Sequence, residues 1–127
     1  MNENTTSGQI VDAAYKVHAT LGPGLLESVY EAALAWDLAK RGLSFTRQQG
    51  IPVIYEEVRI HPGFFADLIV ENQVIVEIKA IEFVAFVHKR QLLTYLKLAD
   101  KRLGLLINFN VVLIKDGIIR IANGLKE

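Results

Sequence analysis

The chain has 127 residues, 51% of them hydrophobic and 22% charged, which is the size and composition of a single soluble domain covering residues 1–127. It contains no cysteine, and this excludes a disulfide framework, a thiolate zinc site and a cysteine nucleophile. Its 14 basic and 14 acidic side chains cancel, so no net charge attracts polyanions to the molecule as a whole.

The N-terminal residues 1–7 are polar and lack the pattern of a secretory signal, and no apolar run is long enough to cross a bilayer. We therefore expect a cytoplasmic protein with no membrane partner. Basic side chains nevertheless cluster along one stretch, at Lys89, Arg90, Lys97, Lys101 and Arg102. A basic ridge of this kind can contact phosphates, but surfaces of mixed charge are also common in proteins that never bind nucleic acid.

The first part of the chain predicts two helices. Apolar residues recur at helical spacing after Ser7, a candidate N-cap, and the Gly-Pro-Gly sequence at residues 22–24 then breaks the chain. A second helix is expected over residues 25–40, with Gly42 at its C-terminus. The positions of this helix that are expected to face inward are Leu26, Val29, Tyr30, Ala33, Leu34 and Leu38.

Extended segments come next. Residues 45–58 have an extended pattern, in which Pro52 indicates an edge strand or a bend. The His-Pro-Gly sequence at residues 61–63 is typical of a turn. Two strands are then expected over residues 64–70 and 74–80.

The last part of the chain predicts a third helix and further strands. Residues 88–99 have an apolar side at helical spacing, and residues 103–109 are nearly all apolar, which is typical of a strand covered on both faces. Residues 111–114 and 118–122 are expected to form a closing hairpin around residues 115–117. This order of elements predicts an α/β (α+β) domain with a mixed sheet flanked by helices.

Charged residues stand where two strands should be apolar. Alternate side chains of a strand share a face, so Glu77 and Lys79 lie on the same side of the strand over residues 74–80. Asp67 interrupts the preceding strand. If residues 71–73 form a three-residue loop, Asp67 falls directly opposite Glu77, whereas a two-residue loop would turn it to the other face.

Two facing carboxylates repel each other, and a hard cation is the simplest reason for them to coexist. Lys79 would then orient or activate the attacking water. The alternative is a lysine–carboxylate ion pair at the end of the sheet, with Asp67 capping a turn. These residues alone leave both interpretations open.

Two further groups lie at helical spacing. Gln91 and Tyr95 are four residues apart, with His88 one turn earlier, and could bind a phosphate or hold the lysine and the carboxylates. The alternative places Tyr95 in the core and Gln91 at its rim. Glu27 lies three residues before Tyr30 and either interacts with the helix dipole or provides a third carboxylate.

Several segments occur in the order of a known family: residues 21–27 (LGPGLLE), the strand with Asp67, residues 77–79 (EIK), residues 91–96 (QLLTYL) and residues 104–109 (GLLINF). Residues 24–30 (GLLESVY) resemble the signature of the GxxExxY family, a branch of the PD-(D/E)XK nuclease superfamily. In one departure, Phe65 stands where we would expect an arginine.

The resemblance implies a restriction-endonuclease-like αβββαβ core. It places the metal ligands at Glu27, Asp67 and Glu77 and the catalytic lysine at Lys79. Gln91 and Tyr95 are similar to the QxxxY motif of RecB-like nucleases.

The implied function is that of an enzyme, a Mg²⁺- or Mn²⁺-dependent nuclease that hydrolyses phosphodiester bonds of DNA, or alternatively of RNA. Three carboxylates are compatible with one metal ion or two. The alternative is a catalytically silent module that binds nucleic acid or a protein, which the zero net charge and small size favour. The same features also fit an enzyme that forms a homodimer or is delivered by a partner protein.

Other chemistries find little support. Residues 22–24 lack the lysine and the serine or threonine of a phosphate-binding P-loop. The three histidines show no zinc-ligand spacing, and the chain contains no Gly-x-Ser-x-Gly motif of an acyl-transfer hydrolase.

Overall fold

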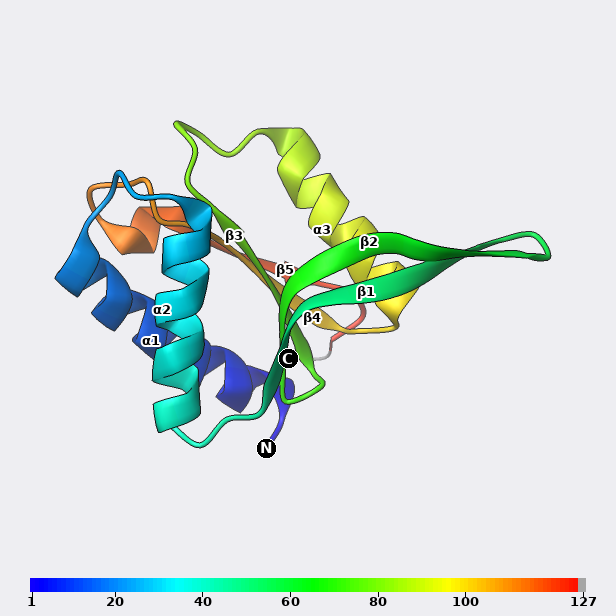
Figure 1. Ribbon diagram of the computed structural model, residues 1–127, viewed down its shortest axis with the longest axis horizontal. Coiled ribbons are helices and arrows are strands. Elements are labelled where there is room, and N and C mark those ends of the chain that lie inside the picture. Colours follow the sequence, from blue (N-terminus) through cyan, green and yellow to red (C-terminus); the bar gives the residue numbers. More distant parts are fainter. Residues whose placement is uncertain (126–127) are drawn as a thin grey trace.

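The computed structural model of the chain describes residues 1–125. Its elements are α1 (Glu3–Leu21), α2 (Glu27–Lys40), β1 (Phe45–Tyr55), β2 (Val58–Val70), β3 (Val74–Lys79), α3 (Phe86–Ala99), β4 (Leu103–Asn108), a 3₁₀ helix η1 (Ile114–Gly117) and β5 (Ile118–Ala122). The five strands form one sheet in the order β1-β2-β3-β4-β5 (Figure 1). Strands β3 and β4 are parallel because α3 carries the chain from one to the other, and the remaining neighbours are antiparallel. The predicted α+β fold with a mixed sheet is confirmed, and its αβββαβ core runs from α2 to β4.

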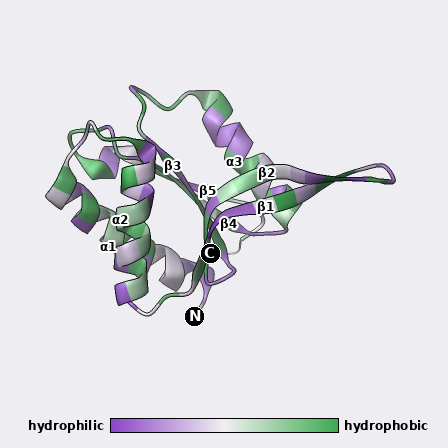
Figure 2. Ribbon diagram, in the orientation of Figure 1, coloured by the Kyte–Doolittle hydropathy of each residue, from purple (hydrophilic) through white to green (hydrophobic). Residues whose placement is uncertain are grey.

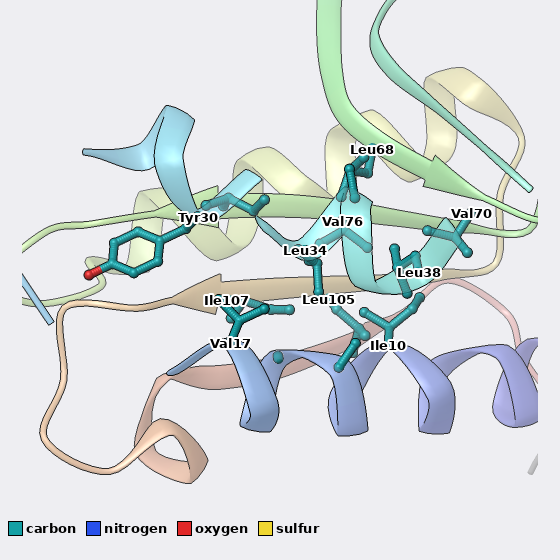
Figure 3. Packing of buried hydrophobic residues seen from close by; sticks show 14 of the residues in the cluster. Ile10, Val17, Tyr30, Leu34, Leu38, Leu68, Val70, Val76, Leu105 and Ile107 are labelled. Atoms are coloured by element: carbon teal, nitrogen blue, oxygen red, sulfur yellow. The ribbon is translucent and has the colours of Figure 1, made fainter. Parts of the chain in front are cut away.

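The central strands β3 and β4 are buried on both faces of the sheet. One face packs against α1 and α2, as Figure 3 shows, and the other packs against α3. Alternate residues of β3 divide between these two cores, with Val76 in the first and Ile75 in the second. Glu77 and Lys79 follow Ile75 at alternate positions and therefore share the α3 side of the sheet.

The first helix begins earlier than predicted. Asn2 caps it by accepting the Thr5 N–H at 2.8 Å, whereas Ser7 is buried within the helix, so the N-cap prediction was wrong. An ion pair of 2.7 Å between Glu3 and Arg102 ties the additional turn to the start of β4. Sequence periodicity could not detect this contact because its two residues are 99 positions apart.

The second helix ends as predicted, but fewer of its side chains are buried than expected. Gly42 follows it with φ of +78° and takes part in the paired backbone bonds of a Schellman motif. Tyr30 and the leucines of the next two turns are buried. Leu26 and Val29 were wrongly predicted to face inward, since they are 74% and 40% exposed. The helix begins only at Glu27, so Leu26 lies outside its first turn.

Strands β1 and β2 form one long hairpin that projects beyond the body of the domain (Figure 1). Its turn lies at Glu56, with φ of +53°, between the paired residues Tyr55 and Val58. The predicted turn at residues 61–63 is therefore wrong. These residues lie within β2, opposite Pro52 alone, and are accommodated as a bulge. The irregularity expected at Pro52 is confirmed by the register shift of β1, an edge strand.

The C-terminal part agrees with prediction in β4, whose six residues are all buried. The hairpin predicted from residues 111–114 and 118–122 is wrong. Ile114, only 4% exposed, begins η1, and β5 pairs with β4. Burial of Ile114 in the core against α1 and α2 takes this segment out of the sheet. Among the described residues, no helix is both long and apolar enough to span a membrane.

Candidate active site

The loop between β2 and β3 sets the register of the site. Residues 71–73 connect the paired residues Val70 and Val74, so the predicted three-residue loop is confirmed. The backbone pairing of the two strands continues as far as Leu68 and Val76. The next opposed positions are Asp67 and Glu77, as the sequence predicts.

Side chains replace the backbone pairing at this point. Asp67 Oδ2 accepts the Ile78 N–H at 2.8 Å, and Glu77 Oε2 accepts the Asp67 N–H at 3.4 Å. Ala66 packs in the α3-side core and Leu68 in the opposite core, so the alternation of β2 is interrupted at Asp67. This interruption lets the Asp67 carboxylate reach the backbone of β3.

Glu77 is a buried carboxyl group, with only 7% of its surface exposed. Burial, and secondarily the neighbouring Asp67 carboxylate, raise the pKa of Glu77 to about 9, while the charge of Lys79 opposes this shift. In the absence of a metal ion, Glu77 therefore keeps its proton at neutral pH. The carboxyl group of Glu77 would ionise if a cation replaced its proton.

Lys79 is the last residue of β3 and is half-buried on the same side of the sheet as Glu77. Its influence on the pKa of Glu77 places its positive charge within electrostatic reach of the carboxyl pair. Within residues 1–125 its ammonium group forms no salt bridge. It is therefore available to a substrate phosphate or an attacking water.

Glu27 reaches the same end of β3 from the other side of the sheet. It is the first residue of α2, and its Oε2 accepts the Ala80 N–H at 3.3 Å. Glu27 and Asp67 line one cleft of about 410 Å³, together with Ser28, Glu31, Gln48 and Ile78. The structure thus brings Asp67 and Glu77 together and places Glu27 at the backbone of the same strand.

The contacts of Tyr30 explain why Gly24, Glu27 and Tyr30 follow one another at intervals of three residues. Its hydroxyl donates to Gly22 O at 2.6 Å and accepts the Leu25 N–H at 3.1 Å, and its ring stacks on Phe109 with centroids 4.6 Å apart. The tyrosine therefore fixes the loop before α2 and, through it, the position of Glu27. Its role is to support the site and not to contact a substrate.

Helix α3 contributes Tyr95 to the site. The ring of Tyr95 stacks on Phe64 with centroids 3.9 Å apart, and burial, followed by the charges of Glu77 and Asp67, raises the pKa of its hydroxyl. Tyr95 is thus both packed against the core and close to the carboxyl pair. Gln91, one turn earlier, is exposed.

His88 has a structural task. Its Nδ1 accepts the Ala85 N–H at 2.9 Å and caps α3, which therefore begins at Phe86, two residues before the predicted start. This bond occupies one ring nitrogen of His88 at the helix start, while Tyr95 lies two turns further along α3.

Three residues near Asp67 were not predicted. Gln48 Nε2 donates to Asp67 Oδ1 at 3.0 Å and to Glu31 Oε1 at 2.6 Å, and Arg47 forms a 3.0 Å ion pair with the buried Glu31. Gln48 has φ of +48°, which is unusual in a strand. The available signals were the polar run at residues 47–49 and Glu31, one helical turn after Glu27. Neither signal indicates that α2 and β1 meet at Asp67.

The carboxylates do not form a complete metal-ligand set. Within residues 1–125, no three histidine, aspartate or glutamate side chains converge closely enough to hold a metal ion by themselves. Asp67 and Glu77 nevertheless fit a hard divalent cation, because both offer oxygen and a dication would offset their mutual repulsion. Mg²⁺ commonly takes one or two protein carboxylates and fills its other positions with water and phosphate.

A comparison with protein families agrees with this geometry. The family model of the PD-(D/E)XK nuclease superfamily matches residues 4–121, and the chain belongs to this superfamily. Neither a curated protein nor a solved structure matches the chain significantly.

Proposed function

We propose that this domain is a metal-dependent nuclease of the GxxExxY branch, which hydrolyses phosphodiester bonds of DNA or, as a second substrate class, RNA. The observation that carries the proposal is the carboxyl pair of Asp67 and Glu77 beside Lys79, in a chain of the PD-(D/E)XK superfamily. A buried carboxyl group with a pKa of about 9 reduces the stability of the fold, and groups with such shifted pKa values occur most often at functional sites.

Mg²⁺ or Mn²⁺ suits this donor set, which contains only hard oxygen ligands. Asp67 and Glu77 would hold the ion, with Glu27 as the third carboxylate at the same end of β3. When bound, the metal supplies Lewis acidity that favours attack by water on the phosphate.

The other side chains have separate tasks in this proposal. Lys79 orients the attacking water and stabilises the charge that develops on the phosphate. Tyr95, whose hydroxyl lies within the field of both carboxylates, orients the lysine or a phosphate oxygen. Gln91 is exposed on the same helix and binds the phosphate backbone.

The GxxExxY assignment is supported by the geometry at the start of α2. The Tyr30 hydroxyl closes the loop around Gly22 and Leu25, and Glu27 then lies against Ala80 N. Glu27 and Tyr30 thus act together, because the tyrosine holds the loop and the loop places the glutamate carboxylate at the end of β3.

The test is cleavage of labelled single-stranded, double-stranded and branched DNA and of RNA, with Mg²⁺, Mn²⁺ or EDTA. Wild-type protein should cleave at least one of these polymers only with metal, and Lys79→Ala and Asp67→Ala should reduce the rate by about 10²-fold or more. Lys115→Ala, an exposed lysine on η1, is the matched control and should cleave like wild type.

Calorimetric titration with Mn²⁺ separates loss of catalysis from loss of metal. Asp67→Ala should abolish binding, whereas Lys79→Ala should bind Mn²⁺ at least as tightly as wild type, because a positive charge has been removed. If no polymer is cleaved and no metal binds, the nuclease proposal is wrong and the domain is a binding module.

A further inference from the structure

The loop that joins β3 to α3 and the first turn of α3 expose aromatic side chains. Phe83 and Phe86 are 72% and 74% exposed, and the adjacent Val87 is 65% exposed. Figure 1 shows this loop, between β3 and α3, at the surface of the domain. Phe83 lies in the loop and Phe86 is the first residue of α3, so the two exposed rings are three residues apart in the chain. Neighbouring exposed aromatic side chains are a common feature of ligand-binding surfaces.

The loop is held in place at three points. Asn108 Oδ1 accepts the Ile81 N–H at 3.1 Å, and Asn108 Nδ2 donates to Ile81 O at 3.0 Å. Val84 packs against the α3-side core, and His88 holds the Ala85 N–H. Phe83 therefore projects from an anchored loop, and Phe86 projects from the first turn of α3.

The sequence on either side of the two rings is rich in basic residues. Between Glu77 and Asp100 the chain has four basic residues, Lys79, Lys89, Arg90 and Lys97, and Glu82 as its sole acidic residue. The first turn of α3 contains no acidic side chain, so the positive end of the helix dipole is not neutralised there. Figure 2 shows the apolar start of α3 followed directly by a hydrophilic turn. A polyanion that carries flat apolar groups matches this arrangement.

We propose that Phe83 and Phe86 form a base-stacking site that binds unpaired nucleotides beside the catalytic carboxylates. Aromatic side chains next to cationic ones are the usual means of binding single strands, in which phosphates meet the cations and bases stack on the rings. In an intact duplex the bases already stack on one another and cannot reach these rings. The preferred substrate is therefore a single strand, or a duplex with an unpaired flap or end.

This inference rests on the proposed nuclease function for the role of the site, but binding can be measured without catalysis. The probes are a fluorescein-labelled oligothymidylate, an abasic strand of equal length and charge, and a duplex of equal length. The affinities are measured by fluorescence anisotropy titration in EDTA, which removes divalent metal ions and so prevents cleavage. The variants are Phe83→Leu/Phe86→Leu, which keeps apolar bulk, and Phe83→Tyr/Phe86→Tyr, which keeps the rings.

The leucine double variant should bind oligothymidylate about 10- to 100-fold more weakly, and the tyrosine double variant should bind within about threefold of wild type. The affinities for the abasic strand and for the duplex should not change in either variant. Trp36→Leu is the matched control, because Trp36 is 71% exposed on α2, and it should bind all three probes like wild type.

Equal binding of the thymidylate and abasic strands, or a leucine variant that binds like wild type, would overturn the stacking site. An equal loss in Trp36→Leu would also overturn it, since the effect would not be local. Cleavage of the same strands with Mg²⁺ is measured separately. Binding that depends on the rings, without cleavage, supports the stacking site and contradicts the nuclease proposal. Cleavage that is equal in wild type and in the leucine double variant supports the nuclease proposal and contradicts the stacking site.

Discussion

Asp67 and Glu77 face each other one position beyond the last backbone pair of β2 and β3, and each carboxyl group accepts a backbone N–H of the opposite strand. The two side chains therefore take over the pairing of the strands where the backbones stop. The same two side chains are the proposed metal ligands. A substitution at either position should consequently affect both the local structure and the chemistry.

Glu77 makes the stability of the metal-free protein depend on pH. The folded protein keeps the Glu77 proton up to a pKa of about 9, whereas the unfolded chain releases it near its ordinary value of 4.5. Between these values the folded state binds more protons, so the free energy of unfolding falls as pH rises. Urea denaturation in EDTA should show a loss of about 2–4 kcal/mol between about pH 5.5 and 8.5.

Glu77→Gln removes the titrating group and should make the free energy of unfolding nearly independent of pH in this window. Asp37 and Glu71 have lowered pKa values, so their contributions change only below the window. Glu82→Gln, at an exposed position, is the control and should keep the wild-type slope. An unchanged slope in Glu77→Gln would show that another group is responsible.

Gln48 should position Asp67 for catalysis. Gln48→Ala removes the amide that donates to Asp67 Oδ1, and we expect cleavage and Mn²⁺ affinity to fall by about 10- to 100-fold. Gln48→Gly should lose as much activity while unfolding no more readily than wild type, because glycine accepts φ of +48° without strain. Gln49→Ala, an exposed neighbour, should remain active. Equal activity of the Gln48 and Gln49 variants would contradict a positioning role.

Tyr30→Phe should destabilise the domain without a change in core volume. Loss of the hydroxyl leaves Gly22 O and the Leu25 N–H without their partner, at a cost of about 1–2 kcal/mol in the free energy of unfolding. Urea denaturation measures this change. Tyr15→Phe, at a residue 46% exposed, should stay within about 0.5 kcal/mol of wild type. Equal stability of the two variants would show that the Tyr30 hydroxyl does not hold the loop.

Asn108→Ala should release the loop that carries Phe83 and leads to Phe86 at the start of α3. The side chain of Asn108 is 2% exposed and holds both backbone groups of Ile81, so its removal should cost about 1–3 kcal/mol. Amide hydrogen exchange should become faster at Ile81, and oligothymidylate binding should weaken because the rings are no longer preorganised. Unchanged exchange at Ile81 would mean that other contacts anchor the loop.

The parts of the fold that sequence predicts correctly depend on neighbouring residues. The length of one loop, residues 71–73, is enough to place Asp67 opposite Glu77, because strand pairing has a period of two. Gly42 ends α2 because a glycine tolerates φ of +78°. The continuous apolar character of residues 103–108 predicts that β4 is covered on both faces.

The parts that sequence misses depend on how separate segments pair and pack with one another. Residues 61–63 have the composition of a turn, yet a register shift opposite Pro52 absorbs them into β2. Gln48 approaches Asp67 and Glu31 only because α2 packs beside the hairpin of β1 and β2.

The sequence by itself therefore determined the order of the helices and strands, apart from the segment at residues 111–114, and the opposition of two carboxylates. Both follow from local periodicity and loop length. Only the tertiary structure decided how those carboxylates are held. Burial of Glu77, the bond from Gln48 to Asp67 and the approach of Glu27 to Ala80 each depend on how separate elements pack together. Their energies come from packing and desolvation in three dimensions, which no local pattern of residues encodes.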